Sequence, residues 1–174
     1  MRNEWITDAG VGRMYLPRLK GCGVPVLESE RIVTRLRAAF NHGNSGGQLL
    51  ELAARLIAES GPPYTSAYMY MLHGSELRLA AFSGRETEHQ VIAVGQGVCG
   101  TAVATGLDQN VGDVQARENY IACNRFTRSE LVVLIRRGER ILGQIDIDSD
   151  VPDPFTADEE RAVREVADAL AVLL

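Results

Sequence analysis

The sequence has few cysteines, no long apolar run and no excess of positive charge, and each shortage excludes a class of protein. The three cysteines make an odd count and form no C-x-x-C pair, so we expect no disulfide framework but a reducing cytoplasm. A net charge of −5 argues against a surface that binds nucleic acid duplexes. Without a run of about 18 apolar residues we expect no membrane span. Residues 1–5 carry an acid and no apolar block, so we expect no secretory signal either.

What the sequence does contain is typical of one globular domain. The chain has 174 residues, of which 45% are hydrophobic and 24% charged, which is enough for a core without disulfides. Glycines and prolines break every period in residues 1–27, so we interpret this stretch as an N-terminal arm. The domain itself is then expected over residues 28–174.

The hydrophobic periods predict an α+β domain. A helix is predicted over residues 29–40, and a second one follows a capping box at Ser45 and Gln48. A final helix follows the capping box at Thr156 and Glu159. A short helix is predicted over residues 99–105, and strands over residues 64–72, 77–81, 90–94, 131–135 and 141–148. We expect the strands to form antiparallel pairs, with helices packed on one face of the sheet.

The segment Gly95-x-Gly97-x-x-Gly100 matches the dinucleotide-binding fingerprint formally. The flanking strands are expected to be hairpin partners, whereas the fingerprint needs a parallel βαβ unit, so we disfavour NAD. A glycine-rich turn at a helix start can still offer amides to a small carboxylate. The simpler alternative is a tight turn beside an ordinary core cysteine.

Two cysteines have surroundings that favour a thiolate. Cys99 is predicted at a helix N-terminus, and Cys123 lies in a polar segment with several arginines. If the two thiols are close together, one can become a sulfenic acid and the other can condense with it. Cys22 lies between two glycines in the arm, and we interpret it as incidental.

Asp146 and Asp148 are expected on one strand face, about 7 Å apart, together with Gln144. The ordinary interpretation is the solvated face of an edge strand. Because like charges at this spacing repel unless a cation or a proton lies between them, the face could instead hold an ammonium group. A metal site is the weaker alternative, because no histidine lies near these acids in the sequence, and we predict no metal.

Five short motifs follow one another in the chain: Gly97-Val98-Cys99-Gly100-Thr101-Ala102, Asp113-Val114, Ile121-Ala122-Cys123, Ser129-Glu130-Leu131-Val132-Val133 and Gly143-Gln144-Ile145-Asp146-Ile147-Asp148-Ser149. In this order they resemble the free methionine-(R)-sulfoxide reductases, which are small GAF-domain enzymes. The resemblance extends over residues 28–174 and implies a central antiparallel sheet, with helices on one face and a ligand pocket on the other.

The resemblance also implies roles for single residues. Cys123 matches the cysteine that attacks the sulfoxide sulfur, and Cys99 matches a second cysteine, a candidate resolving thiol. Glu130, Asp146 and Asp148 match acids that bind the free amino acid and assist protonation of the sulfoxide oxygen, and Tyr70 matches an aromatic residue of the pocket. No cofactor is implied beyond an external dithiol such as thioredoxin, and a homodimer is expected.

The chain departs from the family pattern at several places. Residues 84–89 contain no cysteine where a further one is usual, which leaves Cys99, or Cys22 on the arm, as the resolving thiol. Ser66 stands where a tryptophan is expected, which leaves Tyr64, Tyr68 or Tyr70 to contact the substrate methyl group. Tyr120 and Asn124 stand where histidine and aspartate are common. The alternative function is a non-enzymatic GAF domain that binds a small molecule and signals through association.

Overall fold

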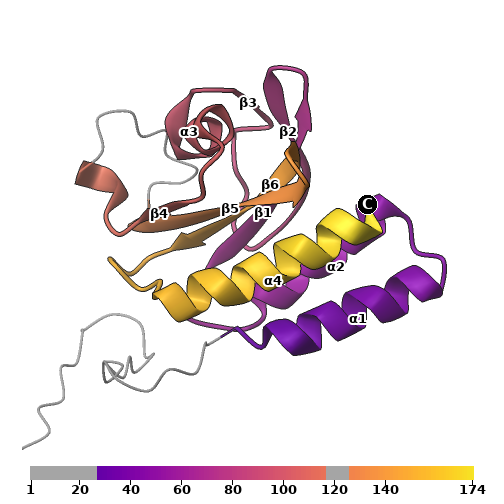
Figure 1. The fold of residues 1–174 in the computed structure, drawn as a ribbon. Helices are drawn as coiled ribbons and strands as arrows, with labels where there is room; N and C mark the ends of the chain where they lie inside the picture. Colours follow the sequence, from indigo (N-terminus) through magenta and orange to yellow (C-terminus); the bar gives the residue numbers. More distant parts are fainter. Residues whose placement is uncertain (1–26, 117–125) are drawn as a thin grey trace, which may run out of the picture.

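The computed structural model describes residues 27–116 and 126–174. Within these ranges the chain forms one sheet of six strands in the order β3-β2-β1-β6-β5-β4, and all neighbouring strands are antiparallel (Figure 1). The strands are β1 (Ser66–His73), β2 (Glu76–Ser83), β3 (Val91–Ala93), β4 (Gln109–Val111), β5 (Ser129–Arg137) and β6 (Arg140–Ser149). The helices are α1 (Ser29–Asn41), α2 (Gly46–Ala58), α3 (Gly97–Thr105) and α4 (Ala157–Leu173), with a 3₁₀ turn at Val114–Ala116.

The helices α1, α2 and α4 cover one face of the sheet, and the short α3 lies on the other (Figure 1). The alternation along β6 explains this division, because Ile145 and Ile147 point to the three-helix side and are fully buried there. The opposite face carries a second apolar cluster that contains Tyr68, Tyr70 and residues of α3. The predicted α+β fold with helices on one face is therefore confirmed, with α3 as the exception.

Both predicted capping boxes are present and explain where α2 and α4 begin. The Ser45 side chain accepts a hydrogen bond from the Gln48 amide, and the Gln48 side chain accepts one from the Ser45 amide. Thr156 and Glu159 form the same reciprocal pair at the start of α4. Each box satisfies backbone amides that lack partners within the helix, so these starts follow from local chemistry.

The sequence patterns did not predict the short strand β4. Its three residues show no alternation, and the strand exists because it pairs with β5. Leu27, assigned to the arm by the sequence analysis, is 1% exposed within the helix-side core. The rest of the arm lies outside the described residues. Among the helices of the described part, none is long and apolar enough to cross a membrane.

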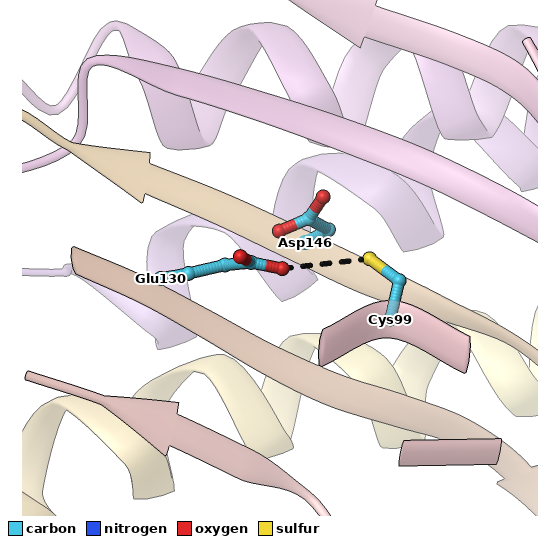
Figure 2. Close-up of side chains that lie close together, drawn as sticks. All are labelled: Cys99, Glu130 and Asp146. Carbon is cyan, nitrogen blue, oxygen red and sulfur yellow. Dashed lines mark hydrogen bonds between the residues drawn. The ribbon is translucent and has the colours of Figure 1, made fainter. Parts of the chain in front are cut away.

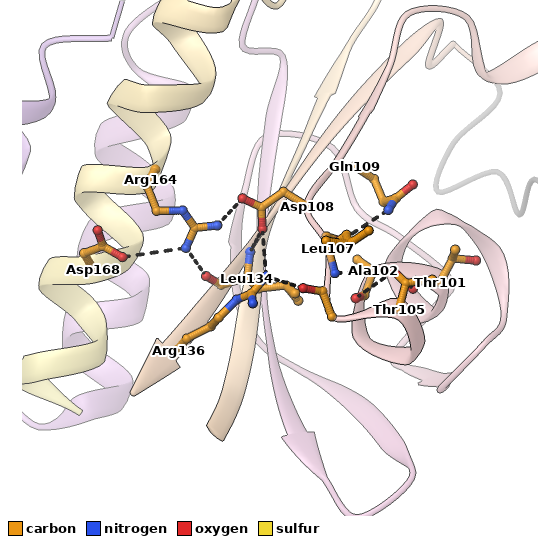
Figure 3. A network of polar contacts seen from close by, with 11 residues as sticks. Thr101, Ala102, Thr105, Leu107, Asp108, Gln109, Leu134, Arg136, Arg164 and Asp168 are labelled. Carbon is orange, nitrogen blue, oxygen red and sulfur yellow. Dashed lines mark hydrogen bonds and ion pairs between the residues drawn. The ribbon is translucent and has the colours of Figure 1, made fainter. Parts of the chain in front are cut away.

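A polar network joins α4 to the sheet at β5. The carboxylate of Asp108 accepts a hydrogen bond of 3.0 Å from the Leu134 amide and pairs with the guanidinium of Arg164 (Figure 3). Arg164 also donates to the Leu134 carbonyl at 2.5 Å. Arg136 donates to the carbonyl of Gly106, which ends α3. This network holds the end of α3 beside β5, and so helps to position the helix that carries Cys99.

Candidate active site

Three predicted site residues lie on the sheet face opposite the three helices. Asp146 and Asp148 lie on β6, and Asp148 is the register partner of Glu130 on β5. Partners in an antiparallel pair project to the same face, so the three carboxyl groups gather there. Because β6 lies between β1 and β5, the interpretation as a solvated edge strand is wrong: Asp146 and Asp148 are both 0% exposed.

The glycine turn brings Cys99 over these acids. The β3 strand before the turn pairs antiparallel with β2, so the formal fingerprint does not lie in a βαβ unit. Gly100 has a packing role, since a Cβ on it would meet the Ala93 carbonyl oxygen at 2.3 Å. The turn thus lets α3 start close against the end of β3, which points the Cys99 side chain at the sheet.

Cys99, Glu130 and Asp146 form a buried cluster. The Cys99 thiol donates a hydrogen bond of 3.6 Å to the Glu130 carboxylate, and the three side chains point toward one another (Figure 2). The thiol sulfur and one carboxylate oxygen from each acid all lie within 4.8 Å of one another. Among the described residues, this is the group of side chains that could hold a metal ion. The prediction of no metal stays a prediction.

The pKa of Glu130 is raised because its carboxyl group is buried among other acids. Burial raises the pKa of Glu130 well above its ordinary value, and the nearby charges of Asp146 and Asp148 raise it further. The hydrogen bond from Cys99 acts in the opposite direction and lowers this pKa, but burial outweighs it. Glu130 can therefore carry a proton at a pH where an exposed glutamate has lost it, as a general acid requires.

Asp148 is perturbed in the same direction. Burial raises its pKa well above the ordinary value, and the charge of Asp146 adds to this effect. A hydrogen bond of 2.9 Å from the Thr127 hydroxyl and the charge of Arg85 partly oppose it. Sequence reasoning missed both Thr127 and Arg85 as neighbours of the site, because only the pairing of distant segments brings them there.

Of the three candidate tyrosines, two lie on the acid-bearing face. Tyr70 and Tyr68 on β1 are fully buried, and their hydroxyls donate to the carbonyls of His89 and Arg85 at 2.8 and 3.0 Å. Tyr68 is the register partner of Asp146. Tyr64 instead packs beside Phe155 in the core under the three helices, so it cannot contact a ligand on the acid-bearing face.

A narrow cavity opens beside the cluster. It is lined by His89, Ile92, Gln96, Gly97, Val98, Cys99 and Glu130, so both the thiol and its carboxyl partner reach it. Cys123 and Cys22, together with Tyr120 and Asn124, lie outside the described residues. Of the three cysteines, Cys99 therefore lies within the described ranges. Its side chain is 3% exposed and donates a hydrogen bond to Glu130.

Comparisons with known proteins identify the family to which this fold belongs. A sequence profile for the GAF domain matches residues 47–174. The chain belongs to the GAF domain family. The GAF profile begins within α2, so α1 lies outside the matched residues and packs against the domain core through Ile32 and Leu36.

Several proteins similar to this GAF domain are reductases by name. The "Free methionine-R-sulfoxide reductase" of Escherichia coli is 37% identical over 108 residues, which is 62% of this chain and 65% of that protein. The type II free methionine-R-sulfoxide reductase of Thermoplasma acidophilum is 34% identical, with a TM-score of 0.71 over 74% of this chain and 91% of the other. The substrate complex of the enzyme from Neisseria meningitidis is 27% identical, with a TM-score of 0.77 over 85% and 89% of the two chains.

Proposed function

We propose that this GAF domain reduces free methionine-(R)-sulfoxide to methionine. The observation that carries the proposal is the buried, hydrogen-bonded pair of Cys99 and Glu130 beside Asp146, in a chain that is similar to named reductases. Reduction of a sulfoxide needs a thiol whose sulfur takes the oxygen and an acid that protonates this oxygen. The thiol and the protonated carboxyl groups of this site can supply both.

In the proposed reaction the Cys123 thiolate attacks the sulfoxide sulfur while Glu130 donates its proton to the sulfoxide oxygen. The sulfur–oxygen bond of the substrate breaks and the protonated oxygen is transferred to the Cys123 sulfur, so the substrate sulfur gains two electrons and leaves as methionine while Cys123 is oxidised to a sulfenic acid. The substrate ammonium lies against Asp146 and Asp148, whose burial makes a cationic ligand favourable there. Tyr70 forms a wall of the pocket on the same face.

The sulfenic acid must then be reduced. We assign Cys99 as the thiol that condenses with it, forming a disulfide and releasing water, with Cys22 as the alternative. An external dithiol of the thioredoxin type then reduces the disulfide by thiol–disulfide exchange, and no other cofactor takes part. We further propose that the protein works as a homodimer in the cytoplasm, which light scattering and fractionation would test.

Turnover of the free amino acid tests the function. The purified protein is incubated with dithiothreitol and either methionine-(R)-sulfoxide or methionine-(S)-sulfoxide, and methionine is measured by chromatography. Methionine should form from the R epimer alone, and Cys123→Ser should abolish it while Cys22→Ser leaves it unchanged. Turnover that survives in Cys123→Ser would keep the enzyme but remove this nucleophile. If the unaltered protein reduces no small sulfoxide, the chain is a binding domain of the sensor kind.

A further inference from the structure

Cys99, Glu130 and Asp146 combine the ligand types that zinc prefers. Zn²⁺ binds both thiolate and carboxylate ligands, whereas Mg²⁺ and Ca²⁺ take oxygen ligands. The three side chains are buried and come from three different elements, α3, β5 and β6, which meet at this point of the sheet (Figure 2). Zinc sites that keep one position open use three protein ligands. The cluster therefore has the ligand types and the ligand number of such a site.

The distances within the cluster fit tetrahedral coordination. With zinc–sulfur and zinc–oxygen bonds of about 2.3 and 2.1 Å, a sulfur and an oxygen bound to one tetrahedral ion lie about 3.6 Å apart. The Cys99 sulfur and the Glu130 Oε1 atom are 3.6 Å apart. The Asp146 oxygen lies within 4.8 Å of both atoms. The side chains therefore need to close by at most about 1.4 Å to bind one ion.

The cavity beside the cluster supplies the fourth position. Cys99 and Glu130 line this cavity, and so does His89. The sequence disfavoured a metal because no histidine lies near the acids along the chain, but the fold brings His89 to the cavity that the thiol and Glu130 share. Imidazole is the commonest metal ligand in proteins. Water from the cavity or the His89 side chain can therefore complete the coordination of an ion in the cluster.

Further buried polar atoms lie on the same face of the sheet. Within the described ranges, the Oδ1 atom of Asp148 and both amide atoms of Gln144 have no hydrogen-bond partner, and both side chains are 0% exposed. Asp148 is the register partner of Glu130, and Gln144 precedes Asp146 by two residues on β6, so their side chains share the acid-bearing face. Buried polar atoms of this kind call for a bound ion or water. They point to a polar ligand on this face independently of the thiol.

We propose that Zn²⁺ binds Cys99, Glu130 and Asp146 in the reduced protein and inhibits it. The ion displaces the protons of the thiol and of the carboxyl groups. It takes the place of the substrate ammonium at Asp146, and it removes the proton that Glu130 donates to the sulfoxide oxygen. The zinc-bound sulfur of Cys99 no longer condenses with a sulfenic acid. The ion is an inhibitor and not a cofactor; its inhibitory effect rests on the proposed function, whereas its binding does not.

Titration of the reduced protein with cobalt(II) and zinc tests the binding. Gel filtration first removes dithiothreitol, which itself binds zinc. Cobalt(II) should give the near-ultraviolet band of a cobalt–thiolate bond, and zinc should abolish the band by displacing cobalt. The Cys22→Ser/Cys123→Ser double variant keeps Cys99 as its one cysteine and should retain the band, with the zinc Kd within twofold. Adding Cys99→Ser should remove the band and weaken zinc binding at least a hundredfold, because loss even of a group that only orients a ligand costs about 10- to 100-fold.

A second variant tests the carboxylate side of the site. Asp146→Asn keeps the shape of the side chain but removes its charge, and it should weaken zinc binding at least tenfold. The control is Glu139→Gln, because Glu139 is exposed in the turn between β5 and β6 and should leave the zinc Kd unchanged. Urea denaturation shows that each variant is folded. A zinc affinity within twofold of the unaltered protein in Asp146→Asn or in Cys99→Ser would overturn the inference.

Single-turnover reduction tests the inhibition. The reduced protein, freed of external thiol, is mixed with methionine-(R)-sulfoxide, and methionine is measured with and without one equivalent of zinc. Zinc should abolish methionine formation, and a chelator should restore it. If the protein reduces no sulfoxide even without zinc, the proposed function fails while the cobalt band still decides the binding. A band that persists without Cys99, or full turnover with zinc bound, would overturn the inference.

Discussion

Replacing Glu130 with glutamine should make the protein less sensitive to rising pH. The glutamine side chain has nearly the same shape, and it can still accept a hydrogen bond from Cys99 and donate one to Asp146. What disappears is the titration of a buried carboxyl group whose pKa is raised chiefly by burial and secondly by the charges of Asp146 and Asp148. The variant therefore isolates the effect of one buried proton on stability.

The direction follows from proton binding in the two states. In the unfolded chain the carboxyl group titrates near pH 4.3, whereas in the folded protein Glu130 keeps its proton to a higher pH. Stability from this group is fully present below the unfolded pKa and is lost as the pH rises through the folded pKa. Between the two values the free energy of unfolding falls by about 1.4 kcal/mol per pH unit for each proton that only the folded state holds.

Because the pKa of Asp148 is also raised, its titration likewise lowers the free energy of unfolding as the pH rises. The Glu130→Gln variant keeps this second contribution. In urea denaturation between pH 4.5 and pH 7.5, the unaltered protein should therefore lose stability with pH more steeply than the variant, by about 1.4 kcal/mol per pH unit between the unfolded and the folded pKa of Glu130. The control is Glu139→Gln, because Glu139 is exposed in the turn between β5 and β6 and its profile should parallel that of the unaltered protein. Stability that rises with pH through this window, or a variant that is less stable at pH 7.5, would refute the reasoning.

The two remaining predictions concern residues that hold the site in place, and urea denaturation measures the change in the free energy of unfolding for each. Gly100→Ala should lower the free energy of unfolding by about 1–3 kcal/mol and lower turnover, because its Cβ would meet the Ala93 carbonyl oxygen at 2.3 Å. The matched Gly47→Ala in α2, where the nearest atom is 4.0 Å away, should instead raise stability by up to about 1 kcal/mol; equal effects of the two changes would contradict this account. Asp108→Ala should cost about 1–3 kcal/mol because the buried Leu134 amide loses its acceptor, and Asp108→Asn should recover most of it; no loss in the alanine variant would mean that another group takes over.

Much of the fold could be predicted from the sequence because its signals are local. The capping boxes at Ser45 and Thr156 lie within one helical turn, so no distant segment is needed to recognise where α2 and α4 begin. The alternation of Ile145 and Ile147 with the acids of β6 likewise depends only on the geometry of a strand. The resemblance to the reductases, carried by short motifs in order, indicated the same sheet with helices on one face.

The tertiary structure alone decided the environment of the site. Cys99 and Glu130 are 31 residues apart in the sequence, and only the placement of α3 over β5 brings the thiol to the carboxylate. Whether Asp146 lies in water or in the core depends on β1 and β5, which flank β6 from distant parts of the chain. The same long-range pairing created β4, and it placed Arg85 under the Phe126 ring. Residue types and spacing therefore determined which chemical groups this protein has, and burial by distant strands decided which of them hold protons, because the pKa of a group depends on everything that surrounds it.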